Sequence, residues 1–134
     1  GIHNIETRVI DSTKAIKKLA EKADRVLIDA PCSGLGVLKR NPDAKWKLQP
    51  EFLESIKDTQ QEILQSYSRM VKPGGELVYA TCSILPSENA AQVKTFLASE
   101  EGKNFTFIKD DNIMPSSSGF DGFYMAKLQK KEKE

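Results

Sequence analysis

Two cysteines, each placed directly after a short apolar run, constrain the fold of this chain more than any other feature. Cys32 lies in the segment Asp-Ala-Pro-Cys-Ser-Gly after the apolar residues 26–28, and Cys82 lies in Ala-Thr-Cys-Ser after residues 77–79. Apolar runs without polar alternation are typical of strands buried on both faces of a parallel sheet. Ligands of such sheets bind outside the carboxyl ends of the strands. The sequence therefore predicts that both thiols lie at the functional edge of one sheet.

Composition narrows the class of protein. The chain has 134 residues, 39% of them hydrophobic and 29% charged, which fits one soluble globular domain. Its net charge of +1 means that any site for nucleic acid has to be a local patch. No apolar run approaches the roughly 20 residues that span a membrane, and no secretory signal pattern is present, so we expect a cytoplasmic protein without membrane contact.

The spacing of the two cysteines argues against several thiol functions. Without a secretory context, reduced thiols are favoured over a disulfide. The two do not form a Cys-x-x-Cys pair, which disfavours both a thioredoxin-type motif and a structural zinc site, so no metal is expected. The only histidine, His3, lies in a predicted turn near the N-terminus and is a poor candidate for a base or ligand.

Strand and helix patterns alternate along the chain, which predicts the α/β class in three layers. Helices are expected after a cap at Ser12, across residues 52–71, and after a cap at Ser87. Residues 31–50 and 110–119 are predicted loops, and residues 130–134 a solvated, charged tail. Strands are expected at residues 5–10, 25–30, 76–80, 104–108 and 123–128.

The loop after the first cysteine carries a second signal. Lys39, Arg40 and Lys45 precede the only tryptophan, Trp46, on the predicted functional edge. Cationic side chains lower thiol pKa values and hold phosphates, and an aromatic ring can stack on a base. The alternative is a solvated basic loop anchored by Trp46, with Cys32 as a small buried residue in a turn.

The second cysteine is followed by Ser83 and, a few residues later, by Glu88 and Asn89. The structural alternative is a strand that ends in small residues before a helix that starts at Ser87 and Glu88. Taken together, the two cysteine segments are far more specific than either alone.

In combination, these segments resemble the RNA 5-methylcytosine methyltransferases of the Sun/Nol/Nop2 (RsmB-like) family. Residues 29–34, followed by Arg-Asn-Pro-Asp-Ala-Lys-Trp at 40–46, are similar to motif IV of that family. The segment 79–89, Tyr-Ala-Thr-Cys-Ser-Ile-Leu-Pro-Ser-Glu-Asn, is similar to motif VI of the family. The segment 121–126, Asp-Gly-Phe-Tyr-Met-Ala, resembles the closing strand of the family's sheet. The resemblance covers nearly the whole chain, with the motifs in order.

The resemblance implies a partial Rossmann-like fold that depends on S-adenosylmethionine. Its sheet is mostly parallel, with the strand 123–128 antiparallel between the strands near 76–80 and 104–108. Residues 1–129 would be the C-terminal part of the catalytic domain. We expect a monomer that acts on ribosomal or transfer RNA.

The resemblance also implies roles for individual residues. Cys82 would be the nucleophile that adds to cytosine, Cys32 would assist release of the methylated RNA, and Asp29 would contact the cytosine ring. Asp11, Asp29 and Pro31 would line the cofactor site.

RNA contacts are expected at a further set of side chains in the loop after the first cysteine. These are Lys39, Arg40, Lys45 and Trp46.

One family feature is missing, because no Gly-rich cofactor loop precedes residue 5. We therefore expect the chain to bind S-adenosylmethionine weakly and to be inactive alone. Two alternatives stay open. One is an inactive RNA-binding domain of the same fold, and the other is a thiol-redox or metal-binding α/β domain.

Overall fold

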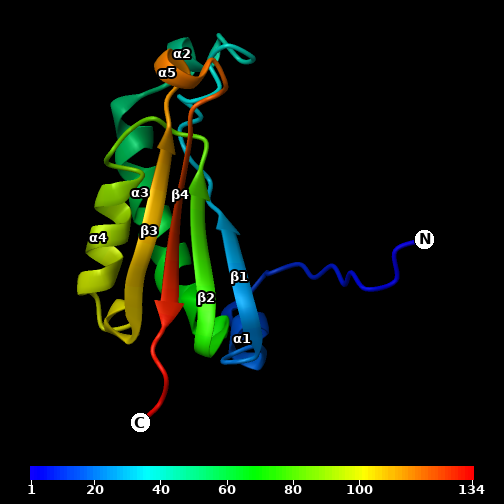
Figure 1. Ribbon diagram of the computed structural model, residues 1–134. Coiled ribbons are helices and arrows are strands. Elements are labelled where there is room, and N and C mark those ends of the chain that lie inside the picture. The colour runs from blue at the N-terminus through cyan, green and yellow to red at the C-terminus, as the bar shows by residue number, and fades with distance from the viewer.

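Four strands form one mixed sheet in the computed structural model, which describes residues 1–134 (Figure 1). The order is β1-β2-β4-β3, with β1 and β2 parallel and β4 antiparallel to both of its neighbours. The predicted position and direction of the strand near 123–128 are therefore confirmed. The strands are β1 (Ala23–Asp29), β2 (Val71–Thr81), β3 (Phe105–Ile113) and β4 (Phe123–Lys130).

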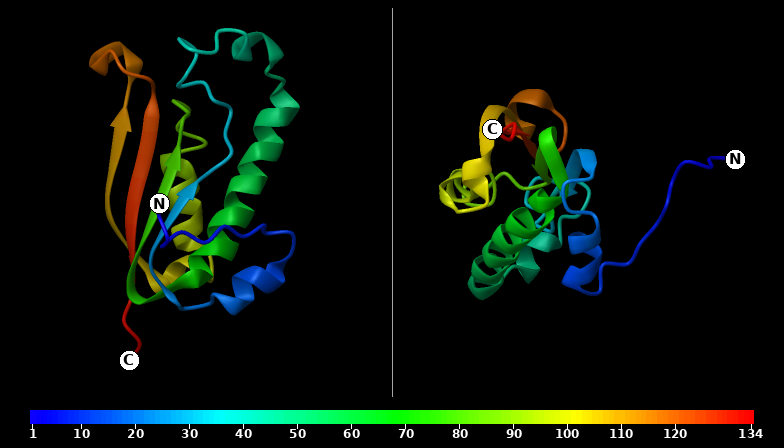
Figure 2. Two further views of the ribbon diagram at one scale, coloured as in Figure 1. Left: turned by 90° about the vertical axis from the view of Figure 1, so that its right-hand side faces the viewer. Right: turned by 90° about the horizontal axis from the view of Figure 1, so that it is seen from below.

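Helices α1, α3 and α4 lie on one side of the sheet, while the short α2 and α5 lie at the end where β1 and β2 finish (Figures 1 and 2). None of the helices is long and apolar enough to cross a membrane. The helices are α1 (Thr13–Lys18), α2 (Ala44–Lys47), α3 (Pro50–Tyr67), α4 (Ala90–Ala98) and α5 (Pro115–Ser118), with 3-10 turns η1 (Ser68–Met70) and η2 (Gly102–Asn104).

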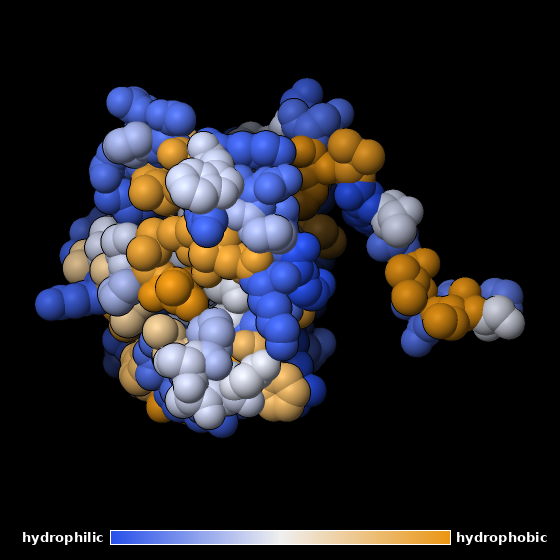
Figure 3. All heavy atoms as spheres, turned by 90° about the horizontal axis from the view of Figure 1, so that it is seen from above, coloured by the Kyte–Doolittle hydropathy of each residue, from blue (hydrophilic) through white to orange (hydrophobic).

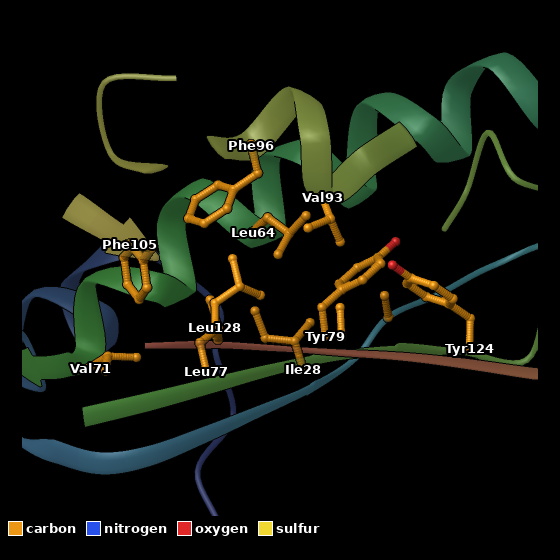
Figure 4. Close-up of a cluster of buried hydrophobic side chains, with 12 residues drawn as sticks. Ile28, Leu64, Val71, Leu77, Tyr79, Val93, Phe96, Phe105, Tyr124 and Leu128 are labelled. Carbon is orange, nitrogen blue, oxygen red and sulfur yellow. The ribbon is translucent and has the colours of Figure 1, made fainter. Parts of the chain in front are cut away.

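The hydrophobic core fills the space between α3, α4 and one face of the sheet (Figure 4). Along α3, Ile56, Gln60 and Leu64 recur every fourth residue and are buried, as expected for an amphipathic helix. They face a sheet in which Leu77 and Tyr79 of β2 are fully buried. This packing fixes the direction of β1 and β2, and with it the position of their carboxyl ends.

The opposite face of the sheet carries no helix (Figure 2), so the expectation of three layers is wrong. Leu27 points to this face and is 69% exposed, whereas its neighbour Ile28 is 3% exposed. The apolar run in β1 is therefore buried on one face only. The sequence pattern shows that both faces of β1 can be buried, but no segment of residues 1–134 covers the second one.

Residues 5–10 do not form the predicted strand. They are exposed and extended, and the N-terminal segment runs away from the sheet (Figure 1). A strand needs a neighbour for its backbone hydrogen bonds, and this segment has none. The apolar residues around Ile5 and Val9 indicate a strand, but such a pattern carries no information on whether a neighbouring strand is present to pair with it.

Several boundaries differ from those expected. β2 begins at Val71 because that residue pairs with Ala23, and β3 runs on to Ile113 because it pairs with β4 along its length. The expected loop at 110–119 therefore contains the end of β3 and the short α5, and the loop at 31–50 contains α2.

The start of α4 and the C-terminal tail also need correction. α4 begins at Ala90 with Asn89 as its N-cap, because residues 86–89 form a turn, so the prediction of a cap at Ser87 is wrong. Lys130 is the last residue of β4 and is 7% exposed, and its ammonium donates to the carbonyl of Val71. The solvated tail therefore starts at residue 131.

Candidate active site

The two cysteines meet at the carboxyl ends of β1 and β2. Their sulfur atoms are 3.1 Å apart, both thiols are free, and both are partly buried. The segments that follow β1 and β2 start side by side, because the amide of Ala30 donates to the carbonyl of Ala80 at 2.9 Å. The prediction that Cys32 and Cys82 share one edge of the sheet is confirmed.

A buried carboxylate, Glu88, joins the two loops that carry the cysteines. It accepts hydrogen bonds from the amide and the hydroxyl of Ser33, at 2.8 and 2.6 Å, and from the hydroxyl of Ser83. The side-chain amide of Gln60 in α3 adds a donor at 3.1 Å. Each serine directly follows a cysteine. Because Glu88 is fully buried without a cation, these four donors hold its charge and fix the two loops together.

The neighbouring Asn89 braces the second loop from the same turn. Its side chain accepts a hydrogen bond from the hydroxyl of Thr81 and donates to the carbonyl of Ser83, on either side of the cysteine. The phenol of Tyr79 donates to the carbonyl of Glu88 at 2.7 Å. The sequence suggested only a helix start for Glu88 and Asn89. Their shared connection to the two Cys-Ser pairs becomes visible only in three dimensions.

The environment of Cys32 favours its neutral form. Burial, followed by the neighbouring thiol of Cys82, raises the pKa of Cys32 well above its ordinary value. Cys32 therefore keeps its proton at neutral pH. At 3.1 Å that proton can be donated to the sulfur of Cys82.

The three predicted cofactor residues do not all meet. Asp29 and Pro31 lie together at the end of β1, where both are exposed, and the Asp29 carboxylate has no hydrogen-bond or ion-pair partner. Asp11 lies instead in a separate hollow of about 270 Å³, beside α1 and the C-terminal half of α3. Neither Asp29 nor Pro31 lines that hollow.

The predicted RNA-binding side chains are all exposed: Lys39 and Arg40 lie in the loop after β1, and Lys45 and Trp46 lie in the short helix α2 at the same end of the sheet (Figure 1). The guanidinium of Arg40 is paired with Asp121 at 2.6 Å, which ties this loop to the start of β4. The Lys45 ammonium lies 4.8 Å from the ring centre of Trp46, which is 77% exposed. Lys39 is exposed and makes no ion pair. Trp46 is therefore a surface ring rather than a packed anchor.

Two glycines that sequence reasoning did not single out hold this edge together. The amide of Gly36 donates to the carbonyl of Cys82 at 2.9 Å, and the amide of Gly122 donates to the carbonyl of Gly36 at 2.7 Å. A Cβ atom on Gly36 would lie 2.2 Å from the carbonyl oxygen of Gly122. Only glycine permits this approach, which links three loops around the second cysteine.

Comparisons with known proteins agree with this arrangement. A family model described as 16S rRNA methyltransferase RsmB/F matches residues 1–129. Ribosomal RNA small subunit methyltransferase B of Pasteurella multocida is 43% identical over an alignment of 126 positions, which covers 86% of this chain and 28% of that protein. The corresponding protein of Vibrio vulnificus is 45% identical over an alignment of 114 positions, which covers 82% of this chain and 27% of that protein.

The chain thus spans about a quarter of the length of these relatives. Among solved structures, NSun6 from Pyrococcus horikoshii with SFG has a TM-score of 0.77 at 26% identity, covering 93% of this chain and 34% of that one. This likeness confirms the expected partial Rossmann-like methyltransferase fold. The match over residues 1–129 and the bacterial relatives confirm the resemblance drawn from the cysteine motifs, and the chain belongs to the RsmB/F family of 16S rRNA methyltransferases.

Proposed function

We propose that this chain is the C-terminal part of the catalytic domain of an RNA cytosine-C5 methyltransferase, in which Cys82 is the nucleophile. The observation that carries the proposal is the contact of 3.1 Å between two reduced thiols at the ends of adjacent parallel strands. Relatives named as ribosomal RNA methyltransferases support RNA as the substrate.

The cofactor of the reaction is S-adenosylmethionine, which supplies the methyl group when bound. The family depends on it, and the SFG in the NSun6 structure is an analogue of it. Asp29 and Pro31 fit one wall of its site, because an unpaired carboxylate and an exposed ring lie at the end of β1 beside the uncovered sheet face. Asp11 is the third proposed contact, although it lies away from that wall.

Cys82 supplies the covalent step. Cytosine C5 is a weak nucleophile, and the thiolate of Cys82 activates it by forming a bond to C6. The electron pair of the C5–C6 double bond moves to C5, which would take the methyl group from the sulfonium of the cofactor and leave that sulfur as a neutral thioether. Water takes the C5 proton, the C5–H electron pair restores the C5–C6 double bond, and the carbon–sulfur electron pair returns to Cys82 as a thiolate.

Cys32 and Asp29 assist this cycle. Because its pKa is raised, Cys32 remains a proton donor next to the sulfur of Cys82 and stabilises that sulfur as it leaves C6. The exposed Asp29 carboxylate accepts a hydrogen bond from the cytosine ring edge and stabilises its protonated form. Lys39, Arg40, Lys45 and Trp46 contact the RNA strand, and the target base leaves its stack to reach the thiols.

The test uses a full-length protein that contains this chain, with the length of its relatives, together with RNA and S-adenosylmethionine. Cys82→Ala should abolish methyl transfer. Cys32→Ala should leave protein covalently trapped on RNA, visible as a slow band on a denaturing gel, and the double variant should show no such band. Trapping in Cys82→Ala would mean that the two roles are exchanged. Absence of both transfer and trapping in the wild type and every variant would favour an RNA-binding module.

A further inference from the structure

A second hollow opens beside the cysteines at the same end of the sheet. Its volume is about 400 Å³, and three loops form it: the one after β1, the one after β2, and the turn between α5 and β4. Its wall contains Gly36, whose amide is bonded to the carbonyl of Cys82. Figure 3 looks onto this end of the molecule, where apolar surface lies between hydrophilic surfaces. The hollow is thus one hydrogen bond away from the backbone of the proposed nucleophile, and none of the proposed catalytic residues lines it.

The lining combines an exposed aromatic ring, apolar side chains and a cation. Phe120 is 76% exposed and takes no part in the hydrophobic core. Lys39 lines the same hollow without an ion-pair partner. The apolar side chains of the lining are Leu35, Leu38 and Ile84. Sites for single-stranded nucleic acid combine the same elements, an aromatic ring on which a base stacks and cations that follow the phosphates.

The local charge also suits an RNA strand. The one carboxylate of the lining, Asp121, is paired with Arg40 at 2.6 Å, so its charge is neutralised rather than opposed to a phosphate. The ammonium of Lys39 is left as the unpaired charge at the hollow. Gly119, with a φ of 74°, ends α5 and turns the chain so that Phe120 projects from the loop.

We propose that this hollow binds a nucleotide adjacent to the target cytosine, with the base stacked on Phe120 and its phosphate beside Lys39. The inference rests on the proposed function, in which a cytosine is taken out of its stack to reach Cys82. Extrusion of one base leaves its neighbour with an unstacked face, and an exposed aromatic ring next to the thiols replaces the lost stacking. Phe120 is then a positioning residue for RNA, without a part in the bond changes.

The test measures RNA affinity, turnover and adduct formation in the full-length protein. A labelled oligoribonucleotide that contains the target cytosine is titrated against the wild type, Phe120→Ala and Phe120→Tyr. We expect Phe120→Ala to raise the Kd and the KM for RNA about tenfold while kcat at saturating RNA stays unchanged. Phe120→Tyr keeps a stacking ring and should stay within about twofold of the wild type. Phe107→Ala, which removes a 44% exposed ring from β3, is the matched control and should change neither constant.

Two outcomes separate the failure of this inference from the failure of the proposed function. Wild-type Kd and KM in Phe120→Ala, with the Cys32→Ala adduct still formed, would overturn the nucleotide site alone. An equal loss in Phe120→Tyr and Phe120→Ala would also overturn it, because stacking would not be the cause. Weakened RNA binding in Phe120→Ala without an adduct in any variant would leave the nucleotide site in place and contradict the role of Cys82.

Discussion

Glu88 is the side chain on which the geometry of the thiol pair depends most. Its carboxylate accepts from four donors, and in Glu88→Gln an NH₂ group would face some of them. We expect a loss of about 2–3 kcal/mol in the free energy of unfolding, because buried donors would lose their acceptor. Urea denaturation of the 134-residue chain measures this. Glu54→Gln, whose side chain is 75% exposed, is the matched control and should change stability by less than about 0.5 kcal/mol. Equal midpoints for the two variants would contradict the bridging role of Glu88.

We expect Cys32 to react more slowly with alkylating agents in the folded chain than in the unfolded chain, because its surroundings favour the neutral thiol. Burial raises its pKa from 9.0 to about 12, so at pH 8.5 the folded protein holds far less Cys32 thiolate than the unfolded chain. The folded state binds this proton more tightly, so the stability that it contributes is complete below pH 9 and is lost as the pH rises toward 12. We expect iodoacetamide to label Cys32 at least about tenfold more slowly in the folded chain than in urea, measured by mass spectrometry of its peptide. Equal rates would indicate an exposed redox thiol instead.

For the thiol pair, the sequence predicted the two reactive residues better than the side chains that hold their loops in place. The common edge of the two cysteines was predictable, because each cysteine follows a buried strand and the carboxyl ends of parallel strands lie at the same edge of the sheet. Glu88 was interpreted only as part of a helix start, since an acidic residue before a helix looks the same whether it is exposed or buried. Its burial depends on Ser33 and Gln60, which are distant in the chain.

The loops around the cysteine edge are held by backbone contacts that tolerate no side chain. In Gly36→Ala the new Cβ would meet carbonyl oxygens of Gly122 and Cys82 at 2.2 and 2.7 Å. Since both are backbone atoms, the loops have to separate, and we expect a loss of about 1–3 kcal/mol together with faster alkylation of Cys82. Gly119→Ala is the comparison, because its φ of 74° costs about 1 kcal/mol while the space around it is open. Similar labelling of Cys82 in both variants would show that the contact does not position the thiol.

Elements with a partner inside the chain were predictable, and elements without one were not. Four of the five expected strands exist, because each finds a neighbour in the sheet. Residues 5–10 have a strand-like pattern but no neighbour, and they stay extended and exposed. The same reason explains the error at β1, where the pattern indicated burial on both faces and Leu27 is 69% exposed.

Across the whole molecule, the sheet has one face covered by helices and one open face, and the two faces have different consequences for the site. The covered face holds a core that aligns β1 and β2 and brings their terminal cysteines together. The open face and the free edge of β1 lie beside Asp29, where the cofactor is proposed to bind. The antiparallel place of β4 could be inferred only from the family resemblance, since nothing in its own apolar pattern specifies direction.

The open face of the sheet beside Asp29 leads to a prediction for cofactor binding. Asp29 and Pro31 form one exposed wall, Asp11 lies in a different hollow, and no Gly-rich loop is present to contact the cofactor. We expect residues 1–134 alone to bind S-adenosylmethionine with a dissociation constant weaker than about 1 mM, because an exposed carboxylate with one neighbouring ring buries too little of the ligand. Isothermal titration calorimetry measures this directly, with a full-length protein containing the chain as the positive control. Saturable binding in the micromolar range to residues 1–134 would contradict the prediction and would require residues 1–12 to move until Asp11 reaches Asp29. Binding to neither protein would instead contradict the proposed use of S-adenosylmethionine.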